Sequence, residues 1–193
     1  MTTDPRTRRT VAALREALRG LLVDRDLDSI TVSEVCRVAG VRRTSFYTHH
    51  QGVGELLTAM LVEEMDQPLA LPDTSQMSIP QLAEHFQETL VDAFRVITRD
   101  RAQFRAAFAS STSSHLRDAL EANFARRLEI ALVEWRGHGT ALEVFDPVAV
   151  PFAAAGLAGS VQAWALSDRD DPVAWAESIR DQMPPWWPRP TAS

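Results

Sequence analysis

The sequence predicts an all-α protein of about nine helices, because apolar residues recur every three or four positions along most of the chain and no segment alternates like a β-strand. A second observation is that two short helical patterns meet at Gly40, which is the pattern of a helix-turn-helix. We therefore predict a three-helix N-terminal domain over residues 1–52 and a larger helical domain over residues 53–193.

In the N-terminal domain, Thr31 followed by Glu34 has the pattern of a capping box and begins the second helix. Gly40 ends that helix in a left-handed conformation, and a third helix is predicted over residues 43–50. The first helix is marked by four apolar residues at helical spacing, namely Val11, Leu14, Leu18 and Leu21.

The same period continues through the larger domain. Further helices are predicted at residues 56–61, 79–97, 99–109, 116–135, 147–166 and 172–183. The proline-containing segment 68–80 is predicted to be a loop, glycines within 136–140 end the helix before them, and the proline-rich tail 184–193 is not helical.

Composition excludes several classes of protein. The chain has 193 residues, 45% of them hydrophobic, so it can bury a core. Cys36 is the only cysteine, which excludes an intramolecular disulfide and favours a reducing, cytoplasmic setting. The polar first ten residues do not resemble a signal peptide. The uncharged run 147–167 is long enough to span a bilayer, but Pro151 and the flanking acidic residues favour a buried helix and no membrane partner.

Charge is unevenly distributed along this chain of net charge −6. Residues 1–50 hold nine Arg and six acidic residues, whereas the remainder holds eleven Arg and twenty acidic residues. A basic first quarter on an acidic body indicates an anionic partner for that quarter alone.

The third predicted helix carries the residue types that read double-stranded DNA. Arg42 and Arg43 are placed to reach guanine O6 and N7 from the helix start. Short or polar side chains suited to phosphates and thymine methyls follow, at Thr44, Ser45, Tyr47, Thr48 and His49. Phe46 and Val41 are predicted to pack against Val35 and Val38. The alternative is a solvated helix in a helix-turn-helix that binds no nucleic acid.

The run "TVSEVCRVAGVRRTSFYTHHQGVGELL" closely resembles the N-terminal domain of TetR/AcrR-type transcriptional regulators. The matching positions are Thr31, Val32, Ala39, Gly40, Val41, Phe46, Tyr47, His49, Glu55, Leu56 and Leu57. The resemblance covers about residues 8–62 and implies that Thr31 and Ser33 contact DNA together with the residues of the third helix.

Three positions depart from the family pattern. Arg42 replaces a small capping residue, His50 replaces Phe, and Val53 replaces a Lys that commonly meets a phosphate. His50 is either a packed neutral imidazole or an extra phosphate contact. Cys36 is predicted to be a buried, inert thiol rather than a redox sensor. The arginines before the first predicted helix, Arg6, Arg8 and Arg9, form either an arm that reaches DNA or a frayed, solvated end.

By resemblance, the last two helices form a four-helix bundle with a second copy of the chain. Small residues spaced four apart let another helix approach closely, and larger apolar residues extend the same surface. The predicted interface is Ala155, Gly156, Gly159, Ser160, Trp164, Trp175 and Ile179. The alternative is burial of these residues within one chain.

The resemblance also implies a pocket for a small-molecule effector in the larger domain. Its predicted lining is aromatic, namely Phe86, Phe94, Phe104, Phe108, Phe124 and Trp135. Its candidate polar groups are His85, Gln103, His115 and Asn123. His85, His115 and His138 lack the spacing of metal ligands, and we expect no metal and no cofactor.

These features predict a ligand-responsive DNA-binding regulator. We expect a homodimeric repressor that a small apolar or aromatic effector releases from a near-palindromic operator. One alternative is a helical dimeric adaptor that has lost specific DNA binding, which the departures at His50 and Val53 suggest. An enzyme is a weaker alternative, because no catalytic triad order, phosphate loop or carboxylate pair stands out.

Overall fold

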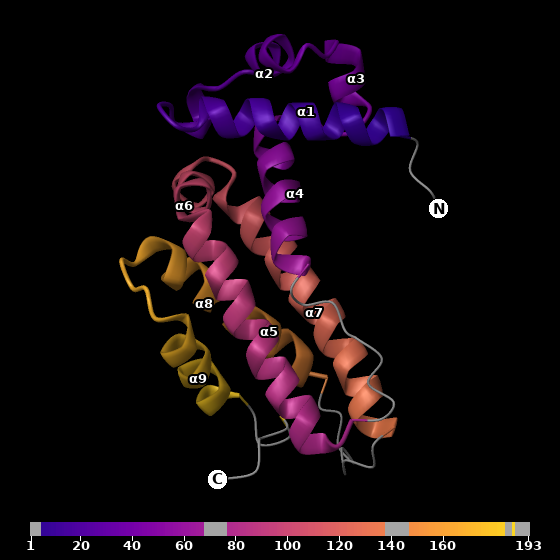
Figure 1. The fold of residues 1–193 in the computed structure, drawn as a ribbon, viewed down its shortest axis with the longest axis vertical. Helices are drawn as coiled ribbons and strands as arrows, with labels where there is room; N and C mark the ends of the chain where they lie inside the picture. The colour runs from indigo at the N-terminus through magenta and orange to yellow at the C-terminus, as the bar shows by residue number, and fades with distance from the viewer. Residues whose placement is uncertain (1–4, 68–76, 138–146, 184–186, 188–193) are drawn as a thin grey trace. The chain divides into compact units, whose positions relative to one another are not determined.

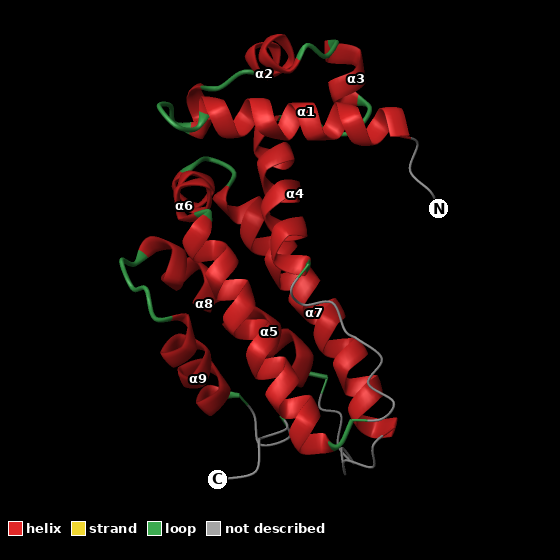
Figure 2. Cartoon of the chain, in the orientation of Figure 1, coloured by secondary structure: helices red, strands yellow, loops and turns green. Residues whose placement is uncertain are grey.

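A computed structural model describes residues 5–67, 77–137, 147–183 and 187. Within these residues the chain forms nine α-helices, one short 3₁₀ helix and no strand, which confirms the all-α prediction (Figures 1 and 2). The elements are α1 (Pro5–Leu21), η1 (Leu27–Ser29), α2 (Val32–Ala39), α3 (Arg43–Tyr47), α4 (Val53–Asp66), α5 (Ile79–Arg99), α6 (Arg101–Ala109), α7 (Ser113–Gly137), α8 (Ala149–Leu166) and α9 (Pro172–Gln182). Most of the predicted loop at 68–80, the helix end at 138–140 and most of the tail at 184–193 lie outside the described residues.

The helices form two compact units. One unit is Met1–Glu63 together with Ala102–Leu116, and the other is Glu64–Arg101 together with Arg117–Ser193. The units therefore divide elsewhere than at the predicted boundary between residues 52 and 53, because α6 and the start of α7 belong with the N-terminal helices. Helix α4 begins in the first unit and ends in the second.

The N-terminal unit has a core to which each of its first four helices contributes. Its fully buried side chains include Leu14 and Leu18 of α1, Val35 of α2, Phe46 of α3, and Leu56, Leu57, Met60 and Leu61 of α4. Burying one such side chain is worth about 1.5–3 kcal/mol, so these contacts hold short helices that would be marginal in isolation. The core therefore determines which faces of α2 and α3 point outward.

The turn between α2 and α3 is defined by local interactions that the sequence predicted. Thr31 accepts a hydrogen bond from the Glu34 amide, and Glu34 accepts one from the Thr31 amide at 2.9 Å, which completes the capping box. Arg25 also pairs with Glu34, at 2.7 Å. Gly40 has φ 66°, a left-handed conformation that glycine adopts without steric cost, and its amide bonds back to the last turn of α2.

Three local predictions about this unit were wrong. Helix α1 begins at Pro5, so Arg6, Arg8 and Arg9 lie in its first turns instead of forming an arm. Proline is favoured at the first helical position, where the missing amide costs nothing. Helix α3 ends at Tyr47 and does not extend to His50. Val38 is 50% exposed because it lies on the outer face of α2, whereas Val35 is buried.

The turn between α6 and α7 is anchored to the N-terminal unit at two points. The Asp28 carboxylate accepts hydrogen bonds from the Ser111 amide at 3.0 Å and from the Ser111 hydroxyl at 2.8 Å. Helix α4 passes so close to this turn that a Cβ atom at Gly54 would lie 2.5 Å from Thr112 Cγ2. These contacts explain why residues 102–116 are part of the first unit.

The second unit packs α5, α7, α8 and α9 around two aromatic clusters. In one, Trp164 of α8 is fully buried, lies 5.6 Å from Phe94 between ring centroids, and donates a hydrogen bond to Thr98 at 3.1 Å. In the other, Trp135 of α7 packs against Leu82 of α5. Helix α8 is the one described helix long and apolar enough to cross a membrane, and 44% of it is buried inside the chain.

Glu34 of the capping box is predicted to make the free energy of unfolding depend on pH. Hydrogen bonds from Arg25 and Thr31 lower the pKa of Glu34 from 4.5 to about 2. A lowered carboxyl pKa adds stability above pH 4.5, and this contribution is lost as the pH falls toward 2. We expect Glu34→Gln to be less stable than the native protein near pH 6, with the difference in unfolding free energy shrinking below pH 4.5.

Urea unfolding at a series of pH values measures that difference. Glu88→Gln, at an exposed position of α5, is the control and should show no such pH dependence. A Glu34→Gln deficit that stayed constant as the pH fell would show that the ion pair contributes nothing to folding.

Candidate nucleic-acid interface and effector pocket

The outward face of α3 is set by the burial of Phe46. That side chain is fully buried, whereas its neighbours Arg43, Thr44, Tyr47 and Thr48 are exposed. Arg42 is also exposed, whereas Ser45 and His49 are half-buried at the edge of the helix. All seven predicted contact residues of this segment therefore reach the surface.

Arg43 and Tyr47 form a pair on this face, one helical turn apart. The Arg43 guanidinium lies 5.9 Å from the Tyr47 ring centroid and donates a long hydrogen bond of 3.5 Å to the phenol oxygen. This hydrogen bond raises the pKa of Arg43, which keeps the guanidinium charged. At 3.5 Å the bond is weak, so the guanidinium is oriented over the ring without being locked there.

A polar hollow lies between α1 and the start of α3. Its lining is basic and rich in hydroxyl groups, from Arg6, Thr7, Thr10, Gly40, Val41, Arg42, Ser45, Thr48 and His49. Guanidinium and hydroxyl groups are the usual donors to phosphate oxygens. Arg6 therefore reaches the predicted face from within α1. Thr7 and Thr10 were missed by the sequence analysis, because polar residues at a helix start resemble an ordinary solvated surface.

The two predicted contacts at the start of α2 differ in their availability. The Thr31 hydroxyl is engaged in the capping box, donating to Glu34 Oε2 at 2.8 Å, while the residue itself is exposed. Ser33 is exposed on the first turn of the same helix. Thr31 therefore contributes to this surface mainly by fixing the start of α2.

The departures from the family pattern have distinct structural effects. Arg42 occupies the N-cap of α3 without a side-chain capping bond, as its chemistry requires. Val53 is buried and puts no positive charge at the start of α4, whose first turn carries Glu55. His50 is also buried, and its Nε2 atom has no hydrogen-bond partner in the described part of the chain. Cys36 is buried, and burial raises the pKa of its thiol, which agrees with an inert side chain.

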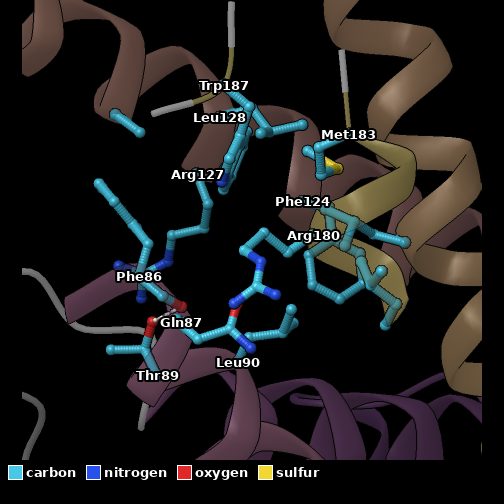
Figure 3. Close-up of a pocket in the computed structure, with 13 residues that line it drawn as sticks. Phe86, Gln87, Thr89, Leu90, Phe124, Arg127, Leu128, Arg180, Met183 and Trp187 are labelled. Atoms are coloured by element: carbon cyan, nitrogen blue, oxygen red, sulfur yellow. Dashed lines mark hydrogen bonds between the residues drawn. The ribbon is translucent and has the colours of Figure 1, made fainter. Parts of the chain in front are cut away.

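The second unit encloses a mainly apolar pocket between α5, α7, α8 and α9 (Figure 3). The empty space within it is about 680 Å³, counting the part open to solvent. The lining residues are Phe86, Gln87, Thr89, Leu90, Phe124, Arg127, Leu128, Ala131, Leu157, Ile179, Arg180, Met183 and Trp187.

Two of the six predicted aromatic residues, Phe86 and Phe124, line this pocket. Trp135 lies behind Phe86, with ring centroids 5.2 Å apart, and Phe94 packs against Trp164. The last two, Phe104 and Phe108, are buried in the first unit on α6. Helical spacing identifies an inward face but does not tell whether that face meets a cavity or close-packed core.

The polar groups of the pocket are not the predicted ones. His85, Gln103, His115 and Asn123 lie outside its lining, which instead contains Gln87, Thr89, Arg127 and Arg180. Arg180 was overlooked because an arginine in a final helix is ordinarily a surface residue. The signal that identifies it is its position between Ile179 and Met183, which share the apolar face of α9.

Arg127 is tied to the end of α4. Its Nε donates to Asp66 Oδ1 at 2.9 Å, and its Nη2 donates to the Asp66 carbonyl at 3.1 Å. Arg126 also pairs with Asp66, at 3.0 Å. Burial alone would raise the pKa of Asp66, but the hydrogen bonds and charges of Arg127 and Arg126 lower it overall. Asp66 is therefore ionised and neutralises a pocket arginine.

The predicted interface residues on α8 and α9 divide into two groups. Trp164 is fully buried in its own chain, so its prediction as an interface residue was wrong; its indole packs against Phe94 and the Arg101 guanidinium. Gly156 is exposed. The half-buried members of the set are Ala155, Gly159, Ser160, Trp175 and Ile179.

Larger apolar side chains extend this surface of α8 and α9. Phe152 is 67% exposed, and Val148, Leu166 and Val173 are exposed as well. A groove between the two helices is lined by residues that include Phe152, Gly156, Ser160, Trp175 and Ile179. Among the described residues, no group of three His, Cys, Asp or Glu side chains is placed to hold a metal ion, and His138 lies outside them.

No protein-family model and no curated protein matches the sequence. The structure, by contrast, is similar to that of the dihydroxyacetone kinase operon activator DhaS, with a TM-score of 0.63 and 14% identity over 89% of this chain and 92% of that chain. The structure is also similar to that of the fatty acid degradation regulator FadR from Bacillus halodurans, with a TM-score of 0.58 and 16% identity over 94% of this chain and 95% of that chain. A third similar structure is the TetR-family repressor AlkX from Dietzia sp. strain DQ12-45-1b, implicated in biodegradation of n-alkanes. Its TM-score is 0.57, with 17% identity over 89% of this chain and 91% of that chain.

The fold and its surfaces define a helix-turn-helix protein with a second helical unit that encloses a pocket. Several of the similar structures are TetR-family transcriptional regulators, and the chain has the TetR-family fold. This agrees with the resemblance seen in the sequence of the helix-turn-helix.

The burial of His50 predicts a pH dependence of the protein's stability, which can be measured. Burial lowers the pKa of His50 from its ordinary value of 6.5; Glu55 opposes this, whereas His49 and Arg15 add to it. The unfolded chain therefore binds a proton before the folded chain does, and stability falls as the pH drops below 6.5. We expect His50→Phe to remove this part of the pH dependence.

Denaturant unfolding between neutral pH and about pH 5 measures the effect, in the interval where an ordinary histidine titrates. The exposed His115→Gln variant is the control and should keep the native pH dependence. If His50→Phe lost stability with falling pH as steeply as the native protein, His50 would be charged in the folded state and available to phosphate.

Proposed function

We propose that the protein is a ligand-responsive, DNA-binding transcriptional regulator. The observation that carries this proposal is the outward face of α3, where Arg42, Arg43 and Tyr47 are exposed on a helix that a capped α2 and the Gly40 turn hold in place. A helix in this position enters the major groove in helix-turn-helix proteins. The fold shared with TetR-family regulators supports the same conclusion.

In this proposal one exposed arginine recognises a base, and other basic and polar residues bind backbone phosphates. Arg43 reads a guanine through its guanidinium, with Tyr47 beneath it. The hollow lined by Arg6, Thr7 and Thr48 binds backbone phosphates and fixes the register of the helix. Because His50 and Val53 are buried, their departures from the family pattern leave this outer face intact.

We further propose that two copies of the chain associate through α8 and α9. The groove and the exposed Phe152 form an apolar surface whose small members, Gly156 and Ser160, permit close helix packing. A dimer of this kind presents two recognition helices about 34 Å apart, which suits a near-palindromic operator.

The pocket is proposed to bind a small, largely apolar effector. Its lining residue Arg127 is bonded to Asp66, the last residue of α4, and α4 begins beside the helix-turn-helix. An effector that prefers one position of α4 shifts the population of the DNA-binding form by its differential affinity. We propose that the effector releases the protein from DNA, so that it acts as a repressor in the cytoplasm.

Selection from a randomised duplex pool tests DNA recognition. We expect enrichment of a two-fold symmetric site, with affinity that falls steeply as salt rises because phosphate contacts release counterions. Arg43→Ala should cost about 1–3 kcal/mol of binding free energy and relax the preference at one base of each half-site.

The control variant Arg95→Ala removes one exposed arginine of α5, in the other unit, and should leave affinity unchanged. A pool that yields no preferred sequence, in a protein that still folds, would sink the proposed function. A native preference that survives Arg43→Ala would instead sink only the assigned role of Arg43.

Light scattering during size-exclusion chromatography tests the proposed dimer. We expect a dimer that Phe152→Glu converts to monomer, because a carboxylate in the centre of an apolar interface has no partner there. Val133→Glu introduces the same charge at an exposed valine of α7 and should leave the dimer intact. A native protein that elutes as a monomer contradicts the dimer without bearing on the pocket.

A further inference from the structure

We infer that the effector is an apolar carboxylate, with its head group held by Arg180 and Gln87 and its tail among the aromatic and aliphatic side chains of the pocket. This inference rests on the proposed function, because it names the class of ligand for the same site. It follows from three properties of the pocket: the charge of its lining residues, the hydrogen-bond and ion-pair partners of its polar groups, and the apolar character of the other lining residues.

The charge of the pocket wall is positive. Two arginines, Arg127 and Arg180, contribute to the lining, and none of the described lining residues is acidic. A ligand with a positive charge would meet two guanidinium groups, whose carboxylate partners, Asp66 and Asp181, lie outside the lining. An amine is therefore excluded, and an anion or a hydrogen-bond acceptor is favoured.

Two of the four polar lining groups are already engaged within the protein. Thr89 donates its hydroxyl to the Phe86 carbonyl at 2.9 Å, as Figure 3 shows. The Arg127 guanidinium is neutralised by Asp66, with an ion-pair distance of 2.7 Å. These residues shape the wall, but neither offers an unused charge to a ligand.

Arg180 is engaged far less. Its Nε lies 3.3 Å from the carboxylate of Asp181, a neighbouring side chain that is 60% exposed, so solvent screens this pair. The Arg180 side chain is itself only 24% exposed. Among the described residues, its two terminal nitrogens have no recorded hydrogen-bond partner, which leaves the planar edge of the guanidinium for a carboxylate.

Gln87 supplies a second donor. Its Nε2 atom is buried and has no hydrogen-bond partner among the described residues. A buried amide donor without an acceptor costs free energy, and a ligand oxygen in the pocket would remove that cost. Gln87 and Arg180 line the same pocket, as Figure 3 shows, and the inference places one head group between them.

The other lining residues of the pocket that the structure describes are aliphatic, aromatic or thioether side chains. Leu90, Phe124, Leu157 and Ile179 are among its apolar lining residues, and Trp187 packs with Phe86 and Trp135 behind. One unneutralised guanidinium matches one unit of negative charge, which favours a carboxylate over a doubly charged phosphate. The combination describes a monocarboxylic acid with an aliphatic or arylalkyl tail.

Calorimetric titration of the full-length protein with three compounds of one chain length tests this inference. The compounds are decanoate, methyl decanoate and decylamine, each near neutral pH and below its micelle concentration. We expect decanoate to bind at least about tenfold more tightly than its methyl ester, because a charge-assisted bond replaces a neutral one. Decylamine should bind more weakly than either.

Variants assign the preference to the two residues. Arg180→Gln should weaken decanoate binding at least about tenfold and leave methyl decanoate nearly unchanged, so retained ester binding shows that the pocket is still folded. Gln87→Leu should weaken decanoate binding by a smaller factor. Arg95→Gln removes one exposed arginine of α5 outside the pocket and should change neither affinity.

Three results would overturn the inference: equal binding of acid and ester, equal weakening of both by Arg180→Gln, or no binding of any of the compounds. None of these results bears on whether the unliganded protein selects a DNA site. Conversely, decanoate that binds through Arg180 without weakening DNA binding would support the ligand class and contradict the proposed release mechanism.

Discussion

The close approach of α4 to the turn between α6 and α7 is the constraint on which the N-terminal unit depends. A Cβ atom at residue 54 would lie 2.5 Å from Thr112 Cγ2, so only glycine permits this packing, whereas Gly52 has open space around it. Asp28 secures the same turn from the other side through Ser111. Residues 102–116, which lie far beyond the helix-turn-helix in sequence, are therefore part of the same unit. The turn between α6 and α7 contacts the first turn of α4 directly.

The other end of α4 meets a different kind of interaction. Asp66 accepts bonds from Arg126 and Arg127, and Arg127 also lines the pocket. The contacts of Arg126 and Arg127 converge on Asp66 Oδ1, and Arg127 also donates to the Asp66 carbonyl, so several bonds hold this residue. One helix is thus held by steric fit at its first turn and by charge at its last.

Prediction from the sequence was correct where a single local pattern determines the structure. Thr31 with Glu34 and the left-handed Gly40 were predicted because each satisfies backbone groups within a few residues of itself. It failed where the outcome depends on packing partners far along the chain. Phe86 and Phe94 share one face of α5, yet only Phe86 borders the pocket, because Trp164 and Trp175 fill the space beside Phe94. Arg180 and Gln87 belong to the pocket only because α9 packs on α5.

An acidic chain can bind DNA only if its positive charges act locally. Solvent ions screen exposed charges beyond about 8 Å at physiological salt, so in the proposed complex with DNA Arg42 and Arg43 act mainly through direct contact. In the proposed complex, Val53 stands where the family has a lysine, so one phosphate contact is missing. The slope of log binding constant against log salt concentration is then smaller by about one unit, and base recognition is unaffected. Arg42 and Arg6 line one hollow and supply positive charge there. Under the proposed function, the departures would lower overall affinity more than sequence preference, and an effector would need less differential binding energy to release the operator.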